Sequence, residues 1–241
     1  MITLKTTKDV AYDSPDHLCP IGTINDNFSS IGLIGEITEY FNNRQITVLD
    51  LGCAGGQFVA DFIGQGDIAV GLEGSSHALT GTGKKNWKKY YNKNLFLCDI
   101  TEDYQLYDDG VPMLFDVIHS EEVFEHISPE DVDSLLLNIF KHLKEGGIGI
   151  FGISLVPDVR NKDGEAMVPP FASEDKTIGY NDELFVLHQS VFPAKWWKEK
   201  IESIGFKIFK NGIHTDNCFG YIFNHSVRYA GNESVYICCT K

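Results

Sequence analysis

Apolar and polar positions along the chain follow two patterns, which predict strands and helices in alternation. Short continuous apolar runs, typical of strands buried in a parallel sheet, occur at 48–51, 68–72, 95–98, 115–119 and 148–154. Segments with helical spacing or helix-capping residues occur at 31–41, 57–63, 77–91, 128–143 and 193–204. Two further strand-like runs, 206–210 and 234–239, close the chain. This alternation predicts an α/β fold with a mostly parallel sheet.

A glycine-rich turn follows the first of these strands. Asp50 lies at the end of the strand, and the turn continues as Gly52, Cys53, Ala54, Gly55 and Gly56. Glycine tolerates positive φ and has no side chain, so a ligand could approach the backbone closely here, at the carboxyl end of a strand. The spacing G-x-x-G-G differs from the G-x-G-x-x-G of dinucleotide-binding folds, which argues against a nicotinamide-dependent dehydrogenase.

The next two strands also end in acidic residues. Glu73-Gly74 follows the second strand and Asp99-Ile100 follows the third. Each acid alone could be a solvated edge residue or a helix cap. Three acids in order at the ends of successive strands indicate a ligand site instead, in which Glu73 could accept hydrogen bonds from vicinal ribose hydroxyls.

The segment from 47 to 154 resembles the S-adenosylmethionine-dependent methyltransferases with a Rossmann-like fold. The resemblance implies a seven-stranded, mostly parallel sheet with helices on both faces and an antiparallel final strand. It also implies that the glycine-rich turn lies under the methionine part of the cofactor and that Asp99 reaches the adenine amino group. In related folds an arm such as 9–30 covers the cofactor. The implied cofactor site is Asp50, Gly52, Cys53, Ala54, Gly55, Gly56, Glu73, Gly74, Asp99, Ile100 and Ser120.

The segment 121–126, directly after the fourth strand, reads E-E-V-F-E-H. If this segment is helical, Glu122 shares a face with Glu125 and His126, because the separations are three and four residues. Two carboxylates and an imidazole at this edge of the sheet could form most of a divalent-metal site. His188, which lies ahead of an aromatic-rich helix, is a fourth candidate.

The order E-x-x-E-H followed by a distant histidine resembles the metal-dependent small-RNA terminal ribose 2′-O-methyltransferases. The E-x-x-E-H part also resembles the ubiquinone-biosynthesis O-methyltransferases. By this resemblance Glu122, Glu125, His126 and His188 would bind Mn²⁺, Mg²⁺ or a similar ion. The motif also occurs in methyltransferases in which the histidine packs behind the cofactor or acts as a base. His126, His188 and His119, at the end of the fourth strand, therefore stay open as candidate catalytic bases.

Composition limits the partners. The 241 residues carry a net charge of -14, which argues against binding to a long nucleic acid. We expect no membrane association and a cytoplasmic location, since the chain shows neither a signal-peptide pattern nor an apolar run long enough to span a bilayer. Six cysteines without C-x-x-C spacing are expected to be reduced.

These observations predict one methyltransferase domain. Its parts are an N-terminal arm and helix (1–45), a cofactor-binding core (46–154), an insertion or substrate loop (155–190), and a C-terminal helix with strands (191–241). The leading hypothesis is an O-methyltransferase that acts, with divalent-metal assistance, on a hydroxyl of a small acceptor such as a sugar or sugar nucleotide. The alternatives are a metal-independent methyltransferase with a histidine base and a non-catalytic cofactor-binding partner protein.

Overall fold

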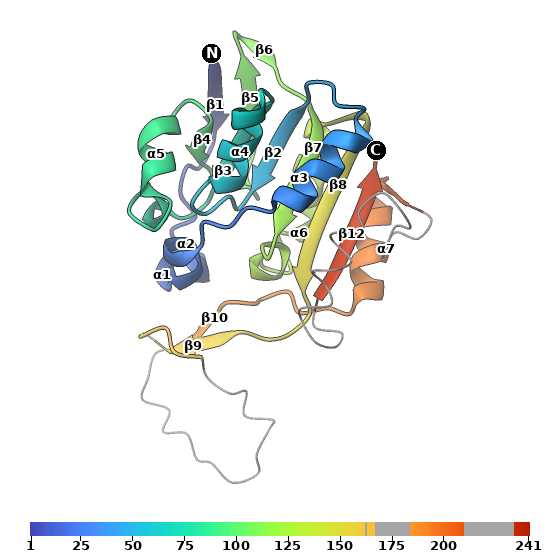
Figure 1. The fold of residues 1–241 in the computed structure, drawn as a ribbon. Coiled ribbons are helices and arrows are strands. Elements are labelled where there is room, and N and C mark those ends of the chain that lie inside the picture. Colours follow the sequence, from blue (N-terminus) through green and yellow to red (C-terminus); the bar gives the residue numbers. More distant parts are fainter. Residues whose placement is uncertain (162, 167–183, 210–233) are drawn as a thin grey trace.

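A seven-stranded sheet forms the centre of the computed structural model, which describes residues 1–161, 163–166, 184–209 and 234–241 (Figure 1). Its strand order is β11-β12-β8-β7-β2-β3-β4. All strands run parallel except β12, which is antiparallel to both of its neighbours. The predicted fold, including the antiparallel final strand, is confirmed. The bounds are β2 Thr47–Leu51, β3 Ile68–Glu73, β4 Leu95–Leu97, β7 Phe115–Glu121, β8 Leu143–Ser154, β11 Lys207–Ile208 and β12 Ser234–Thr240.

Helices cover both faces of this sheet (Figure 1). On one face lie α3 (Ile31–Tyr40), α4 (Gln57–Gln65) and α5 (Lys84–Tyr90), which share an apolar cluster. On the other face α6 (Val132–His142) and α7 (Ala194–Ile204) bury a second cluster. Successive residues of β2 alternate between them, because Val48 packs into the first cluster and Leu49 into the second. No helix in the described parts of the chain is long and apolar enough to cross a bilayer.

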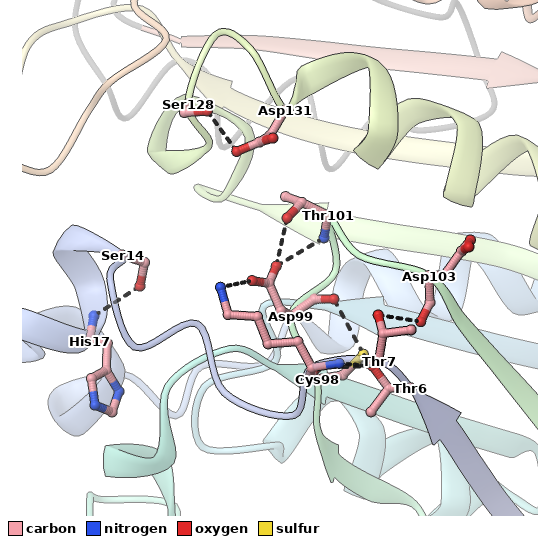
Figure 2. Close-up of polar contacts among 11 residues, drawn as sticks. Thr6, Thr7, Ser14, His17, Cys98, Asp99, Thr101, Asp103, Ser128 and Asp131 are labelled. Carbon is pink, nitrogen blue, oxygen red and sulfur yellow. Dashed lines mark hydrogen bonds and ion pairs between the residues drawn. The ribbon is translucent and has the colours of Figure 1, made fainter.

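Three predicted element boundaries are wrong. The helix predicted at 77–91 is split into a 3₁₀ turn, η1 (Ser76–Leu79), and α5, because the N-terminal arm meets the chain between them and Thr82 N donates to Ile24 O at 2.8 Å. Helix α6 begins at Val132 rather than at Ser128, whose hydroxyl donates to the Asp131 carboxylate at 2.7 Å instead of capping a helix (Figure 2). Strand β8 begins at Leu143, five residues before the predicted start at Ile148.

The N-terminal segment forms structure that the sequence pattern did not predict. Strand β1 (Ile2–Thr6) pairs with β5 (Tyr104–Asp108), which also pairs with β6 (Val111–Pro112), in a small second sheet. The arm after it contains two short helices, α1 (Pro15–Leu18) and α2 (Ile21–Asn25). The arm is fastened to the carboxyl edge of the large sheet, since Ala11 N donates to Gly74 O and Gly55 N donates to Asp26 O.

The segment predicted as an insertion contains a short hairpin. Strands β9 (Val159–Asn161) and β10 (Leu184–Val186) pair in antiparallel fashion, and β10 lies against α1 of the arm. Phe171 and Tyr180, two aromatic residues of this segment that could line an acceptor site, fall outside the described residues. A 3₁₀ turn, η2 (Phe124–His126), follows β7.

Candidate active site

The glycine-rich turn after β2 is shaped by close backbone packing. Gly52 and Gly56 have φ of 68° and 73°, a region that glycine adopts without strain. A Cβ at Gly52 would overlap the Val123 side chain, and one at Gly55 would overlap the side chain of Asn27 from the arm. Both positions therefore require glycine. The turn leads directly into α4, whose first residue is Gln57.

Glu73, the last residue of β3, is buried and oriented by backbone donors. One carboxylate oxygen accepts a hydrogen bond from Ala54 N and the other from Ser75 N, both at 2.9 Å. Burial raises the pKa of Glu73 to about 7, although these two hydrogen bonds act in the opposite direction. Each oxygen keeps a further lone pair, so the carboxylate can still accept hydrogen bonds from a ligand.

Asp99, which follows β4, is held from two sides (Figure 2). Thr101 donates to Oδ1 from its backbone N at 3.1 Å and from its hydroxyl at 2.7 Å. Lys8 Nζ lies 3.1 Å from Oδ2. The Asp99 side chain is 9% exposed, so the carboxylate of this ion pair is largely shielded from solvent.

A cavity of about 330 Å³ connects these groups with the histidine cluster. Of the candidate cofactor residues, those that line it are Gly52, Ala54, Glu73, Gly74, Asp99 and Ile100. The remaining candidates, which are not among its lining residues, are Asp50, Cys53, Gly55, Gly56 and Ser120. At the other end the lining includes His126, His188, Asp158 and Arg160.

Glu125, His126 and His188 lie close enough together to bind one metal ion. Each offers a ligand atom within 4.8 Å of the others. Glu125 is fully buried; its Oε1 accepts a hydrogen bond from Ser154 N, while Oε2 has no hydrogen-bond partner among the described residues. Burial and the neighbouring Glu122 raise the pKa of Glu125 to about 8. A buried carboxylate oxygen without a partner beside two imidazoles fits a cation of the Mn²⁺ or Zn²⁺ type.

Glu122 is not part of this three-residue group. The condition that 121–126 is helical is not met, because the 3₁₀ turn covers only Phe124–His126. Glu122 itself has a φ of 52°, outside the helical region, and its N donates to Gly152 O. The argument that helical spacing places Glu122 on one face with Glu125 and His126 therefore does not hold, although the Glu122 side chain does line the cavity.

The two histidines of the cluster differ in protonation. Burial lowers the pKa of His126, but Asp16 at 2.9 Å from Nδ1, together with Glu125 and Glu122, outweighs it and raises the pKa to about 9. Burial lowers the pKa of His188, whose Nδ1 lies 2.6 Å from Val156 O. Because a carbonyl only accepts, His188 Nδ1 must donate, and Nε2 carries the lone pair.

His119 lies behind the cavity rather than in it. Its Nδ1 is 2.8 Å from Asp50 Oδ1, and its ring lies 4.3 Å from the ring of Phe58. Its Nε2 is 3.9 Å from Glu121, which lines the cavity and accepts a hydrogen bond from the Tyr236 hydroxyl at 2.6 Å. His119 is thus connected to the cavity through Glu121.

The structure adds cavity residues that the sequence analysis did not identify. They are Asp16 and Asp26 on the arm, Glu121 on β7, and the Asp158–Arg160 pair, joined by hydrogen bonds of 2.8–3.0 Å. Arg160 is the only lysine or arginine among the described lining residues, so acidic side chains dominate the cavity. Only Glu121 had a signal in the sequence, as the first acid after the fourth strand.

Comparisons with known proteins agree with this architecture. A family model described as a methyltransferase domain matches residues 31–211. A ubiquinone biosynthesis O-methyltransferase from Rickettsia canadensis is 29% identical over 122 residues, which are 49% of this chain and 47% of the relative. The chain therefore matches the curated relative over about half of that protein's length.

Solved structures resemble the whole fold at low sequence identity. A TehB-like SAM-dependent methyltransferase from Corynebacterium glutamicum superimposes with a TM-score of 0.55 at 15% identity, covering 92% of both chains. A SAM-dependent methyltransferase from Clostridium acetobutylicum gives a TM-score of 0.56 at 14% identity, covering 89% of this chain and 92% of the other. At these identities the comparison shows the fold alone.

Proposed function

The chain belongs to the S-adenosylmethionine-dependent methyltransferases, and from this premise we propose that it methylates a hydroxyl oxygen of a small acceptor with the help of a divalent cation. Glu125, His126 and His188 would hold the cation. The observation that carries the proposal is that His126 and His188 line the same cavity as Glu73 and Asp99. An acceptor bound at the cluster would therefore lie beside the cofactor.

The charge of the cavity supports a neutral acceptor. Asp16, Asp26, Glu121 and Glu122 line the cavity, and Arg160 is already paired with Asp158. A phosphate group would be repelled there, so a sugar or similar polyol suits the cavity better than a sugar nucleotide. The similarity to an O-methyltransferase over half of the chain favours oxygen as the methylated atom.

The chemistry requires a methyl donor, an aligned oxygen and a route for one proton. The cofactor supplies a methyl group on a positively charged sulfur; transfer forms a carbon–oxygen bond and breaks a carbon–sulfur bond. A divalent cation, when bound, lowers the pKa of a coordinated hydroxyl. Glu125 is oriented for coordination by Ser154 N, and His126 must release its proton before it can bind metal.

A second reaction scheme rests on His188. Its lowered pKa keeps it neutral at pH 7, and its Nε2 is free to accept the hydroxyl proton without any metal. Among the three candidate bases, His126 is already protonated near neutral pH and His119 does not line the cavity. His188 is therefore the better general base in this scheme.

Calorimetric titration with Mn²⁺ and with S-adenosylhomocysteine tests the proposal. We expect wild type to bind both, and a Glu125→Gln, His188→Ala variant to lose Mn²⁺ binding while keeping the cofactor product. His77→Ala, which changes a histidine outside the cavity, is the matched control. Unchanged Mn²⁺ binding in the double variant would remove the metal site. Methylation of a polyol panel that persists in excess chelator would favour His188 as the base.

A further inference from the structure

The segment that follows β1 makes two contacts with Asp99, the acid that we expect at the adenine end of the cavity. Lys8 Nζ forms the ion pair with Asp99 Oδ2, and Asp99 N donates to Lys8 O at 3.1 Å. Thr101 holds the other carboxylate oxygen with two hydrogen bonds. Figure 2 shows Asp99 between Thr101 and the Thr6–Thr7 segment of the N-terminal strand. Both oxygens of Asp99 are therefore oriented by the protein.

The backbone around Lys8 is itself fixed. The Thr6 hydroxyl donates to Lys8 O at 2.9 Å, and Thr7 N donates to Asp103 O at 3.1 Å. Thr6 is also the last residue of β1 in register with Tyr104 of β5. The Lys8 side chain is 36% exposed, whereas that of Asp99 is 9% exposed, so an ammonium held at the surface reaches a buried carboxylate. This arrangement restricts rotation of the Asp99 carboxylate.

We infer that Lys8 is a positioning residue for recognition of the adenine amino group, acting through Asp99. With Thr101 on Oδ1 and Lys8 on Oδ2, the carboxylate plane is fixed, and a remaining lone pair can face a ligand in the cavity. Without Lys8, nothing described here holds Oδ2, and the carboxylate can turn away from the amino group. The inference rests on S-adenosylmethionine as the cofactor and on Asp99 at its adenine end; it is independent of the proposed acceptor and cation.

A structural role alone makes a different prediction. If the ion pair only fastens β1 to the core, its loss should weaken binding of every adenosine-like ligand by the same factor. If Lys8 orients Asp99 toward the amino group, loss of Lys8 should selectively weaken binding of the ligand that carries the amino group. The ratio of affinities for two ligands that differ only at this group separates the two roles.

The experiment is calorimetry with S-adenosylhomocysteine and its 6-deamino analogue, in which the 6-amino group is replaced by hydrogen and N1 stays an acceptor. Wild type should prefer the amino ligand by about 10- to 100-fold, the effect of one hydrogen bond to a charged group. Lys8→Met and Lys8→Gln should reduce this preference to about threefold or less. Lys8→Arg should keep most of it, since the charge and donors remain, and Lys5→Met, which changes a lysine of β1, is the matched control.

Two outcomes would overturn the inference. If Lys8→Met and Lys8→Gln weaken binding of both ligands by the same factor, so that the ratio of the two affinities is unchanged, Lys8 has a purely structural role. A wild type that does not distinguish the ligands would show that Asp99 does not recognise the amino group. Thermal unfolding of each variant checks that the fold persists, and binding of S-adenosylhomocysteine to wild type verifies the cofactor separately.

Discussion

Binding of the cofactor is expected to depend on pH through Glu73. This carboxyl has a pKa of about 7 because it is buried, so about 90% is ionised at pH 8 and about 10% at pH 6. The ionised form accepts hydrogen bonds from ribose hydroxyls on both oxygens, whereas the protonated form presents a donor on one of them. If only the ionised form binds well, the affinity for S-adenosylhomocysteine should fall about tenfold from pH 8 to pH 6, or about 1.4 kcal/mol.

The comparison of wild type with Glu73→Gln by calorimetry from pH 6 to pH 8 isolates this effect. The glutamine of the variant stays neutral throughout, so the contribution of residue 73 to the pH dependence should vanish. At pH 8 the variant should bind S-adenosylhomocysteine about 10- to 100-fold more weakly than wild type. Other cavity groups that titrate in this range, such as Glu125, affect both proteins equally, so their effect cancels in the ratio of the two affinities at each pH. Glu39→Gln, an exposed position on α3, is the matched control. An identical pH dependence in wild type and Glu73→Gln would refute the reasoning.

Three further predictions concern the turn and the core. Gly52→Ala should lower the free energy of unfolding by about 1–3 kcal/mol and weaken calorimetric cofactor binding, because its φ is 68° and the new methyl would overlap Val123. Burial of His142 lowers its pKa to about 4, so the stability it contributes should be full above pH 6.5 and fall toward pH 4. Urea unfolding should therefore show that wild type loses about 2 kcal/mol of unfolding free energy between pH 7.5 and pH 5, relative to His142→Phe. Asp116→Asn should cost about 1–3 kcal/mol at pH 7 in the same assay, since the carboxylate accepts hydrogen bonds from two basic side chains that keep its pKa low, and the difference should shrink as the pH falls below 3.8.

The sequence predicts the fold and the placement of Glu73 and Asp99 at one edge of the sheet because their signals are local. An apolar strand, a glycine-rich turn and an acid at the strand end are adjacent in the chain, and parallel strands bring such ends to one edge. Glu73 and Asp99 follow this rule, and both line the cavity. The spacing at 121–126 is compatible with a helix, but no helix forms over the whole segment. Glu122 adopts a φ of 52° between β7 and η2, and the spacing does not indicate this.

Contacts between distant parts of the chain could not be predicted in this way. Asp16 meets His126 across 110 residues, and Tyr236 meets Glu121 across 115. The second contact also needs Gly152, since a Cβ there would crowd both side chains. No periodicity or motif in either partner signals such a contact, because each residue alone is compatible with a solvated loop or strand end.

Distant contacts also bring residues 1–30 to three parts of the cavity wall. Lys8 pairs with Asp99, Asp26 O accepts a hydrogen bond from Gly55 N of the glycine-rich turn, and Asp16 pairs with His126 of the cluster. The family model begins at residue 31, so these three contacts come from a segment outside the match. The matched segment, residues 31–211, contains the sheet edge, Glu73 and the cluster of Glu125, His126 and His188. Features that distinguish this chain from others with the same core should therefore be sought first in residues 1–30, which contact Asp99, the glycine-rich turn and the cluster.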